Sequence, residues 1–377
     1  MPQPTKDPQD TFVWSENPAR TERGLSGNKT PKETSEQNCD AVKARTDIAA
    51  GEMALCVLKG RHSLTDGDPT IQAQLPRPDE IPDWCANADW DYNRVLSCRN
   101  GIETFALIQD GKIIGTADVE TWDLVRTNHN NNKFSWDQWA NVASTAGQFR
   151  DLWAGLTYQG VGMCTGQCAL ETVNVGPRLV PSSTWLRTYH IWHSTISTIG
   201  GRNKPSLDVE MTWILPGTIP MNTTYNRSLD RDIRCDYRSP GTNAYYGCIF
   251  PEFRPTLRVP RSILPEYADH IADAQATNWP VGMPGGLPLT RLTNQDDIDE
   301  NRTMSCANQP SPRPSGQQCD EYPFASTYQG SYTSGFDASS RLINEQQNHD
   351  GGQQLQEFYQ LYRILDKEAF HVQVVTI

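Results

Sequence analysis

The sequence predicts an α+β protein with an antiparallel β-sandwich-like region on the N-terminal side and a small mixed domain at the C-terminus. Three observations lead to this prediction. Short apolar runs separated by Asn, Gly and Pro fill residues 39–259, as in sandwiches of short strands. After Pro260 the apolar residues follow helical spacing instead. The 377 residues are also enough to bury two cores, so we expect a domain boundary near residue 260.

Residues 1–38 are rich in Pro, Lys, Thr, Glu and Asn, with few apolar side chains. We interpret them as a flexible leader or linker without a core of its own. No segment approaches the roughly 18 apolar residues of a membrane span, and the first residues lack the apolar stretch of a signal peptide. We therefore expect no membrane span, and an exported chain would have lost its signal or would use another delivery route.

Residues 104–116 give the clearest strand signal. Two apolar runs flank Asp110 and Gly111, and this dipeptide supplies the positive φ angles of a tight hairpin turn. His190 and His193 could both face a metal ion, but positions three apart in a strand point to opposite faces, so we interpret them as ordinary sheet positions. The further expected strands are 156–158, 169–175, 185–199, 207–215 and 245–250.

The ten cysteines predict a disulfide framework formed in an oxidising compartment, because their number is even and they fall as near-neighbour couples. Sequence does not decide the connectivity, and sequential pairing is the simplest arrangement. It joins Cys39 to Cys56, Cys85 to Cys98, Cys164 to Cys168, Cys235 to Cys248 and Cys306 to Cys319. The alternative is a zinc site, but no second couple of Cys or His residues at zinc-ligand spacing lies near the closest pair.

Two helices are expected after the boundary. The first covers residues 263–275, where Tyr267, Ile271 and Ala274 recur at helical spacing. The second is a short acidic helix at 296–302. The C-terminal domain therefore combines helices with the polar segments that carry the candidate chemistry.

Two of those segments stand out. Residues 319–327 place adjacent carboxylates, Asp320 and Glu321, before a proline turn. Residues 344–363 are expected to form a polar loop that ends at a Gly-Gly step, followed by a helix. The buried stripe of that helix is expected to be Leu355, Phe358, Tyr359 and Tyr362.

Asn348 and Asp350 lie where the N-cap of this helix is expected, so helix capping is one interpretation. A metal site is the other, because a loop and a helix start can direct an amide oxygen and carboxylates to one point. Mg²⁺ and Mn²⁺ prefer such oxygen donors. The residues alone leave both interpretations open.

Four segments of the C-terminal part together form the pattern of one enzyme family. They are residues 265–271 (Pro-Glu-Tyr-Ala-Asp-His-Ile), the Asn301–Arg302 step, residues 319–325 (Cys-Asp-Glu-Tyr-Pro-Phe-Ala), and an Asn-x-x-Gly-Gly element at 348–352. With these segments, the chain from about Arg261 to its end resembles the NucA/NucB family of extracellular deoxyribonucleases. The Asp-Glu-aromatic-Pro block is the most specific of the four.

The resemblance implies that residues 260–377 form a ββα-metal-like nuclease domain, in which a hairpin and a helix hold one divalent cation, Mg²⁺ or Mn²⁺. Asp320 stands where the family has its essential acidic residue and would act as general base toward water. Glu321 would support that base or the metal. Asn348 would be a metal ligand, and Glu357 would reach the metal through water, or else be an exposed helix residue.

This sequence also departs from the family. The residue before the helix asparagine is commonly acidic but is Gln347 here, so Glu345 would have to supply that carboxylate as a metal ligand. The candidate substrate contacts are Ser326, Gln347 and His270, with a buried structural role as the alternative for His270. Arg302 is the candidate for a second phosphate contact in catalysis, and an exposed surface arginine is the alternative.

The implied activity is hydrolysis of DNA phosphodiester bonds by a secreted, metal-dependent endonuclease. The charge is unusual for such a function. The net charge is −12, and residues 261–377 contain seven Lys and Arg against fifteen Asp and Glu, whereas phosphate contacts usually come from basic side chains. We therefore expect weak, salt-sensitive DNA binding that depends on a bound cation.

Two further interpretations stay open. Residues 39–259 could serve delivery, partner binding or shielding, and a nuclease behind such a region suits an antibacterial toxin effector with a cognate immunity protein. The other interpretation is an extracellular β-sandwich binding protein whose C-terminal domain has lost catalysis. The Gln347 departure favours it, and intact Asp320, Glu321 and Asn348 oppose it. The sequence does not indicate the oligomeric state.

Overall fold

The computed structural model describes residues 39–45, 48–58, 70–71, 75–85, 89–174, 176–219, 222–238, 245–277, 281–335 and 338–376. The expected leader, residues 1–38, lies outside the described residues. The chain divides into a unit that ends at Phe250 and a unit that begins at Pro251. Strand 256–260, just before the expected boundary, pairs with the last strand of the second unit. No helix in the described ranges has the length and apolarity to cross a membrane.

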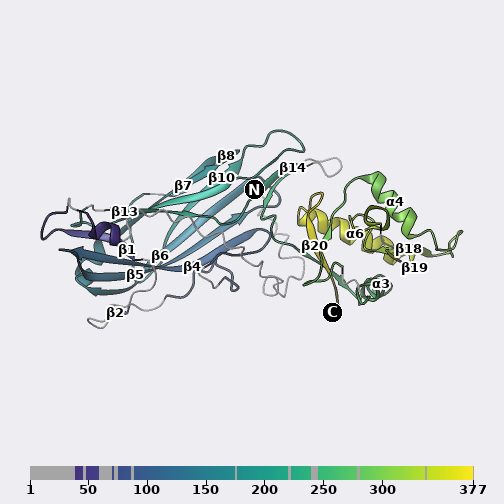
Figure 1. Ribbon diagram of the computed structural model, residues 1–377, viewed down its shortest axis with the longest axis horizontal. Helices are drawn as coiled ribbons and strands as arrows, with labels where there is room; N and C mark the ends of the chain where they lie inside the picture. Colours follow the sequence, from purple (N-terminus) through teal and green to yellow (C-terminus); the bar gives the residue numbers. More distant parts are fainter. Residues whose placement is uncertain are drawn as a thin grey trace, which may run out of the picture. The chain divides into compact units, whose positions relative to one another are not determined.

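Antiparallel strands build the N-terminal unit. Its largest sheet has three long central strands, β4 (Leu96–Gln109), β5 (Lys112–Thr127) and β6 (Lys133–Gly147), in the order β1-β4-β5-β6-β10-β8 (Figure 1). Its other strands are β1 (Met53–Leu58), β2 (Thr70–Ile71), β3 (Asp91–Tyr92), β8 (Cys168–Asn174) and β10 (Leu186–Ser194).

Two smaller sheets complete this unit. The four-stranded sheet consists of β13 (Asn222–Ser228), β12 (Ser206–Ile214), β7 (Thr157–Thr165) and β9 (Arg178–Leu179). The three-stranded sheet consists of β11 (Arg202–Asn203), β14 (Arg234–Arg238) and β15 (Tyr245–Ile249). The helical segments are α1 (Cys39–Lys43), α2 (Phe149–Leu152) and the 3₁₀ turn η3 (Trp153–Gly155).

The predicted hairpin is confirmed. β4 and β5 pair from Gln109 opposite Lys112, and the turn residues Asp110 and Gly111 have φ angles of 48° and 75°. His190 is buried on β10 while His193 is partly exposed, so the two rings face opposite sides of the sheet as expected.

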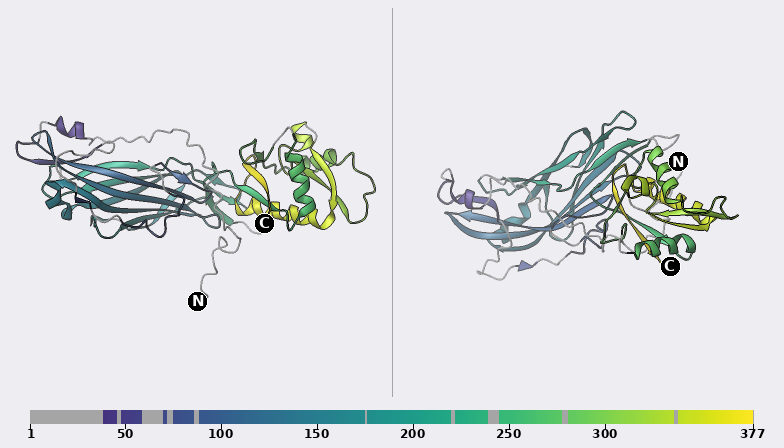
Figure 2. Two further views of the ribbon diagram at one scale, coloured as in Figure 1. Left: turned by 90° about the horizontal axis from the view of Figure 1, so that it is seen from below. Right: turned by 45° about the vertical axis from the view of Figure 1, so that its right-hand side comes forward.

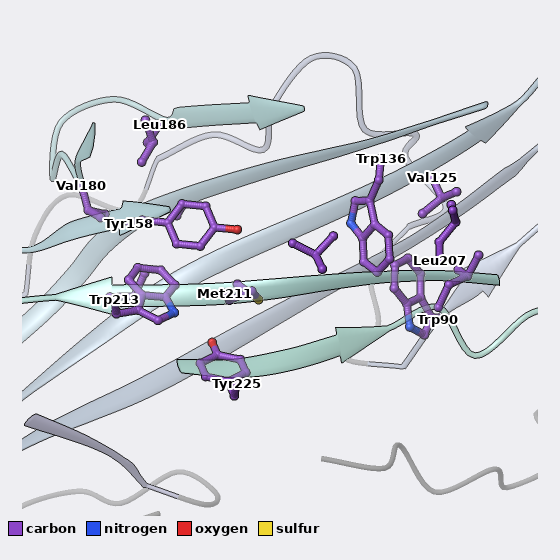
Figure 3. Packing of buried hydrophobic residues seen from close by; sticks show 14 of the residues in the cluster. Trp90, Val125, Trp136, Tyr158, Val180, Leu186, Leu207, Met211, Trp213 and Tyr225 are labelled. Atoms are coloured by element: carbon purple, nitrogen blue, oxygen red, sulfur yellow. The ribbon is translucent and has the colours of Figure 1, made fainter. Parts of the chain in front are cut away.

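Aromatic side chains fill the core between the large and the four-stranded sheet. The Trp213 ring of β12 lies 4.8 Å from the Phe105 ring of β4 and 4.7 Å from the Tyr158 ring of β7, centroid to centroid. Trp90 meets Trp136 of β6 edge to face at 5.4 Å. Figure 3 shows Trp213, Tyr158 and Trp136 gathered among strands of both sheets. This packing joins strands that are far apart in the sequence.

A buried ionic network crosses the same core. Arg227 of β13 donates to Oδ2 of Asp123 at 2.5 Å and also contacts Glu103. Trp136 and Gln138 donate to Oδ1 of Asp123 at 2.8 and 2.9 Å. Burial alone would lower the pKa of Arg227, but the two carboxylates outweigh it and raise that pKa. The network therefore keeps its charges in an apolar interior only because each has a partner.

Arg227→Met is expected to destabilise the N-terminal unit by about 3–5 kcal/mol, because it removes the hydrogen-bonded cation of the buried Asp123 and the part-buried Glu103. Urea unfolding, followed by tryptophan fluorescence, measures this loss. Lys204→Met is the control, since Lys204 pairs with Asp232 at 3.5 Å on the surface and such pairs contribute about 0–1 kcal/mol. Equal losses for the two variants would contradict a structural role for the buried network.

A small sheet and a separate antiparallel strand pair organise the C-terminal unit. β20 (Ala369–Val375) pairs in parallel with β16 (Thr256–Pro260) and antiparallel with β17 (Leu289–Thr290). β18 (Gln317–Tyr322) and β19 (Ser339–Asn344) pair with each other. The helices, seen in green and yellow in Figure 2, are α3 (Pro265–Gln275), α4 (Gln295–Ser305), α5 (Ser331–Ser334) and α6 (Glu345–Leu361).

The predicted fold class is confirmed. The N-terminal unit is antiparallel and sandwich-like, and β18, β19 and α6 form a ββα element in the C-terminal unit. The helix expected at 263–275 is present as α3, and the short acidic helix is present as the longer α4. On α6, Leu355, Phe358 and Tyr359 are buried as expected, and Tyr362 just after it is half-buried.

The prediction of a polar loop before the last helix is wrong. α6 already begins at Glu345, and its N-cap is Asn344, whose side chain accepts hydrogen bonds from two backbone N–H groups of the first turn. Asn348 and Asp350 therefore lie inside the helix and do not cap it. Asn, Asp and Gly disfavour helix interiors, which explains the prediction, but tertiary packing of α6 outweighs those preferences.

The predicted disulfide pairing is confirmed at all five positions: Cys39–Cys56, Cys85–Cys98, Cys164–Cys168, Cys235–Cys248 and Cys306–Cys319. All ten cysteines are used. A zinc site built from cysteine thiolates is thereby excluded.

Candidate active site

Two constraints hold Asp320 and Glu321 in place. Both residues lie on β18, where Asp320 is paired with Arg341 of β19. The disulfide between Cys306 and Cys319 ties the residue before Asp320 to the end of α4. The backbone that carries the two carboxylates is therefore fixed by the strand pairing and by the disulfide.

These carboxylates line a cavity of about 820 Å³, which we call the acidic cavity. Its charged and polar side chains include Arg302, Arg313, Asp320, Glu321, Ser326 and Asn348. Its apolar side chains include Tyr267, Phe324 and Leu355. Residues from α3, α4, β18 and α6 thus meet around one space.

Burial raises the pKa of both carboxyl groups. Desolvation raises the pKa of Asp320, and the hydrogen bond and charge of His270 offset this in part. Desolvation and then the neighbouring Asp320 charge raise the pKa of Glu321 to about 7, while Arg302 and Arg313 act in the opposite direction. Two adjacent carboxylates with little water around them disfavour each other's ionisation.

His270 lies behind Asp320, outside the wall of the acidic cavity. Its ring is fully buried on α3. Nδ1 is 2.6 Å from Oδ2 of Asp320, and Nε2 is 2.9 Å from Oγ of Ser339. Oδ2 of Asp320 is thus held by the histidine, and the backbone of Glu321 also hydrogen-bonds to this carboxyl group.

Helix α6 brings Asn348 to the carboxylates. Its Nδ2 donates to Oε1 of Gln318 at 3.2 Å and to the carbonyl oxygen of Cys319 at 3.4 Å, which leaves the amide oxygen as an acceptor. α6 approaches α3 closely at Gly351, where an added Cβ would lie 2.6 Å from the Tyr267 ring. Glycine at this position therefore permits the helix spacing that places Asn348 beside β18.

The Asn301–Arg302 step serves two purposes. Asn301 is fully buried, and its Nδ2 donates to the carbonyl oxygen of Ala325 at 2.8 Å. Its Oδ1 accepts from the backbone N–H groups of Tyr332 and Thr333 at 2.9 and 3.0 Å. Asn301 thus fixes the segment that follows β18, while the next side chain, Arg302, lines the acidic cavity.

The donor set of the acidic cavity fits a hard divalent cation. Asp320, Glu321 and Asn348 offer carboxylate and amide oxygens, which Mg²⁺ and Mn²⁺ prefer. Desolvation is the main cause of the raised pKa values, and nearby His270, Arg302 and Arg313 offset it only in part. Cys306 and Cys319 also lie close to Glu321, but their sulfur atoms are joined in a disulfide and cannot serve as thiolate ligands.

The acidic cavity brings together five of the nine predicted site residues: Arg302, Asp320, Glu321, Ser326 and Asn348. The other four, His270, Glu345, Gln347 and Glu357, do not line it. Glu345 accepts from Nε2 of Gln318 at 3.0 Å, Gln347 accepts from the backbone N–H of Glu266 at 2.8 Å, and Glu357 is exposed on α6. The catalytic, metal and substrate roles of all nine stay predictions.

Arg313 lines the acidic cavity, although the sequence analysis did not single it out. It is exposed, and its charge lowers the pKa of Glu321. Within the described part of the chain it has no ion-pair partner. The available signal was its position as the only basic residue between Cys306 and Cys319.

The C-terminal unit thus contains a strand pair followed by a helix, with carboxylates, an amide and arginines around one cavity. The model of the family described as Deoxyribonuclease NucA/NucB matches residues 286–373, so this part of the C-terminal unit is similar to the domain of that family. Comparisons with curated proteins and with solved structures gave no match. The matched range contains Asp320, Glu321 and Asn348, whereas α3 with His270 precedes it.

Glu321→Gln is expected to stabilise the C-terminal unit at pH 8 but not at pH 4, in EDTA. The folded-state pKa of about 7 exceeds the ordinary value of 4.5, so the folded protein binds more protons and loses stability as the pH rises between these values. The glutamine amide of the variant does not ionise, so the variant avoids that loss. Its free energy of unfolding is therefore expected to be higher by about 1–3 kcal/mol at pH 8.

Hydrogen exchange of the α6 and β18 amides measures this effect in the unit concerned. Glu357→Gln is the control, because it changes an exposed carboxylate of α6 outside the acidic cavity. If Glu321→Gln stabilised the unit equally at pH 4 and pH 8, the cost assigned to the buried charge of Glu321 would be wrong.

Proposed function

We propose that the C-terminal unit is a metal-dependent endonuclease that hydrolyses DNA phosphodiester bonds. The match to the NucA/NucB family supports the deoxyribonuclease activity. One observation carries the rest: the oxygen donors of Asp320, Glu321 and Asn348 line the same cavity as the guanidinium groups of Arg302 and Arg313. Such a cavity has groups for a cation and groups for a phosphate.

Glu321 and Asn348 would hold the cation, Mg²⁺ or Mn²⁺, next to Asp320, the proposed general base. When bound, it supplies positive charge that offsets the negative charge developing on the phosphate oxygens. The same charge favours the ionised form of both carboxyl groups, whose pKa values burial raises. The excess of acidic side chains in this unit then favours metal binding, although it opposes DNA binding in the absence of metal.

Asp320 is the proposed general base. A base must lie within hydrogen-bond reach of the attacking water, and Asp320 lines the acidic cavity. With Oδ2 held by His270, Oδ1 takes the proton as the water oxygen attacks phosphorus. The departing 3′ oxygen leaves on the opposite side of the phosphorus atom, as an in-line displacement requires.

Arg302 and Arg313 are the proposed phosphate contacts. Guanidinium groups donate charge-assisted hydrogen bonds to phosphate oxygens. Ser326, whose hydroxyl lies 3.1 Å from that of Tyr359, adds a neutral donor on the cavity wall. With few cationic contacts, affinity for DNA is modest and falls as salt increases.

Export of the protein is part of the proposal. The five disulfides support it, because such bonds form and persist in oxidising compartments. The β-rich unit in front would serve delivery or partner binding. If the protein is an antibacterial toxin, the producing cell requires an immunity protein that covers the acidic cavity.

The oxidised protein of residues 1–377 is expected to convert supercoiled plasmid to open-circular and linear DNA in Mg²⁺ or Mn²⁺, and EDTA is expected to stop the cutting. Asp320→Ala should lower the rate by about 10²–10⁴-fold, the usual contribution of a general base. Asp273→Ala, which removes an exposed carboxylate of α3, should cut at the wild-type rate. Wild-type protein without metal-dependent cutting would favour the alternative, an extracellular binding protein with an inactive C-terminal domain.

Arg313→Gln is expected to raise KM for DNA while leaving kcat within about twofold, because one phosphate contact is lost. The slope of log KM against log salt concentration should fall by about 1. Arg261→Gln is the control, since Arg261 pairs with Asp269 at 2.8 Å and does not line the acidic cavity. An unchanged salt slope in Arg313→Gln would contradict the proposed contact.

A further inference from the structure

We propose that His270 is a positioning residue for the active site: it holds Oδ2 of Asp320, so that Oδ1 stays directed to the acidic cavity, and Ser339 holds the histidine ring in turn. This inference rests on the proposed nuclease function. It assigns to His270 a role behind the reactive carboxylate, in place of the direct contact with substrate that the sequence suggested.

The hydrogen bonds define the orientation of the ring. A carboxylate only accepts hydrogen bonds, so Nδ1 of His270 donates to Oδ2 of Asp320 across 2.6 Å. Nε2 lies 2.9 Å from the hydroxyl of Ser339, which donates to it when the ring is neutral. Both nitrogens are engaged, so neither is left for a phosphate or a base of DNA.

Packing keeps this arrangement in place. His270 is fully buried, and its neighbours on α3, Ala268 and Ile271, are fully buried too. Asp320 retains only 3% of its surface. A buried carboxylate that loses its donor must find another or turn. The ring therefore decides which oxygen of Asp320 faces the reacting water.

The chain brings this histidine to the site by tertiary packing. α3 lies against both β18 and β19, the strands that carry Asp320 and Ser339. The matched family range begins at residue 286, after α3. The inference thus extends the functional unit toward the N-terminus, beyond the matched residues.

Three variants of the oxidised protein of residues 1–377 test the inference. His270→Asn retains a side-chain N–H at the Nδ1 position and can still hold Asp320, whereas His270→Gln retains one only at the Nε2 position. Ser339→Ala removes the second contact at an exposed site without opening a cavity in the core. Each variant is assayed for plasmid cutting at saturating Mg²⁺, with thermal unfolding recorded alongside.

We expect His270→Gln to lower kcat by about 10–100-fold with KM for DNA unchanged, as for other residues that orient a catalytic group. His270→Asn should keep kcat at least about fivefold higher than His270→Gln. Ser339→Ala should lower kcat severalfold with wild-type stability. This ranking distinguishes positioning from a structural role, which would affect the Asn and Gln variants alike.

Several outcomes would overturn the inference. Equal kcat in the Asn and Gln variants would do so, as would a loss confined to KM, which would indicate a direct substrate contact. If neither histidine variant folds, wild-type kcat in Ser339→Ala would be decisive against it. Wild-type protein that cuts as fast as all three variants would refute positioning and leave the nuclease intact, whereas wild-type protein that does not cut would refute both.

Discussion

The C-terminal unit depends on one electrostatic constraint: two adjacent carboxyl groups on β18 are kept in a space with little water. Desolvation raises the pKa of both, most clearly that of Glu321. Neighbouring side chains reduce the cost of ionising these carboxyl groups. His270 donates to Asp320 from behind, and Arg302 and Arg313 supply positive charge from the cavity wall. The divalent cation that we propose for this site would relieve that cost further, because Mg²⁺ and Mn²⁺ take oxygen ligands.

Local signals in the sequence were enough for most of the fold. The hairpin at Asp110–Gly111 follows from turn geometry, and α3 follows from apolar spacing. The disulfides follow the simplest arrangement, in which each cysteine pairs with its neighbour in the sequence. Asp320 and Asn348 were found because they stand in motifs of a known family, and the acidic cavity brings these two residues together.

The remaining features depend on contacts that spacing alone does not reveal. α6 begins before the Asn-x-x-Gly-Gly element, because Asn344 caps it and Gly351 packs against the Tyr267 ring. Both effects outweigh the weak helix preference of those residues. Arg313 lies in a loop whose sequence has no apolar periodicity. Its place at the acidic cavity is known only from the structure. The partner of His270 is 50 residues away, so no local pattern could indicate it.

β20 has a consequence for the order in which the nuclease unit assembles. It is the central strand of its sheet, since both β16 and β17 pair with it. It also follows the whole acidic cavity in the sequence. During translation, the residues of that cavity leave the ribosome before the strand that closes their supporting sheet. A nascent or prematurely terminated chain therefore lacks the central strand of this sheet, and the acidic cavity forms on a completed support only after β20 has been made.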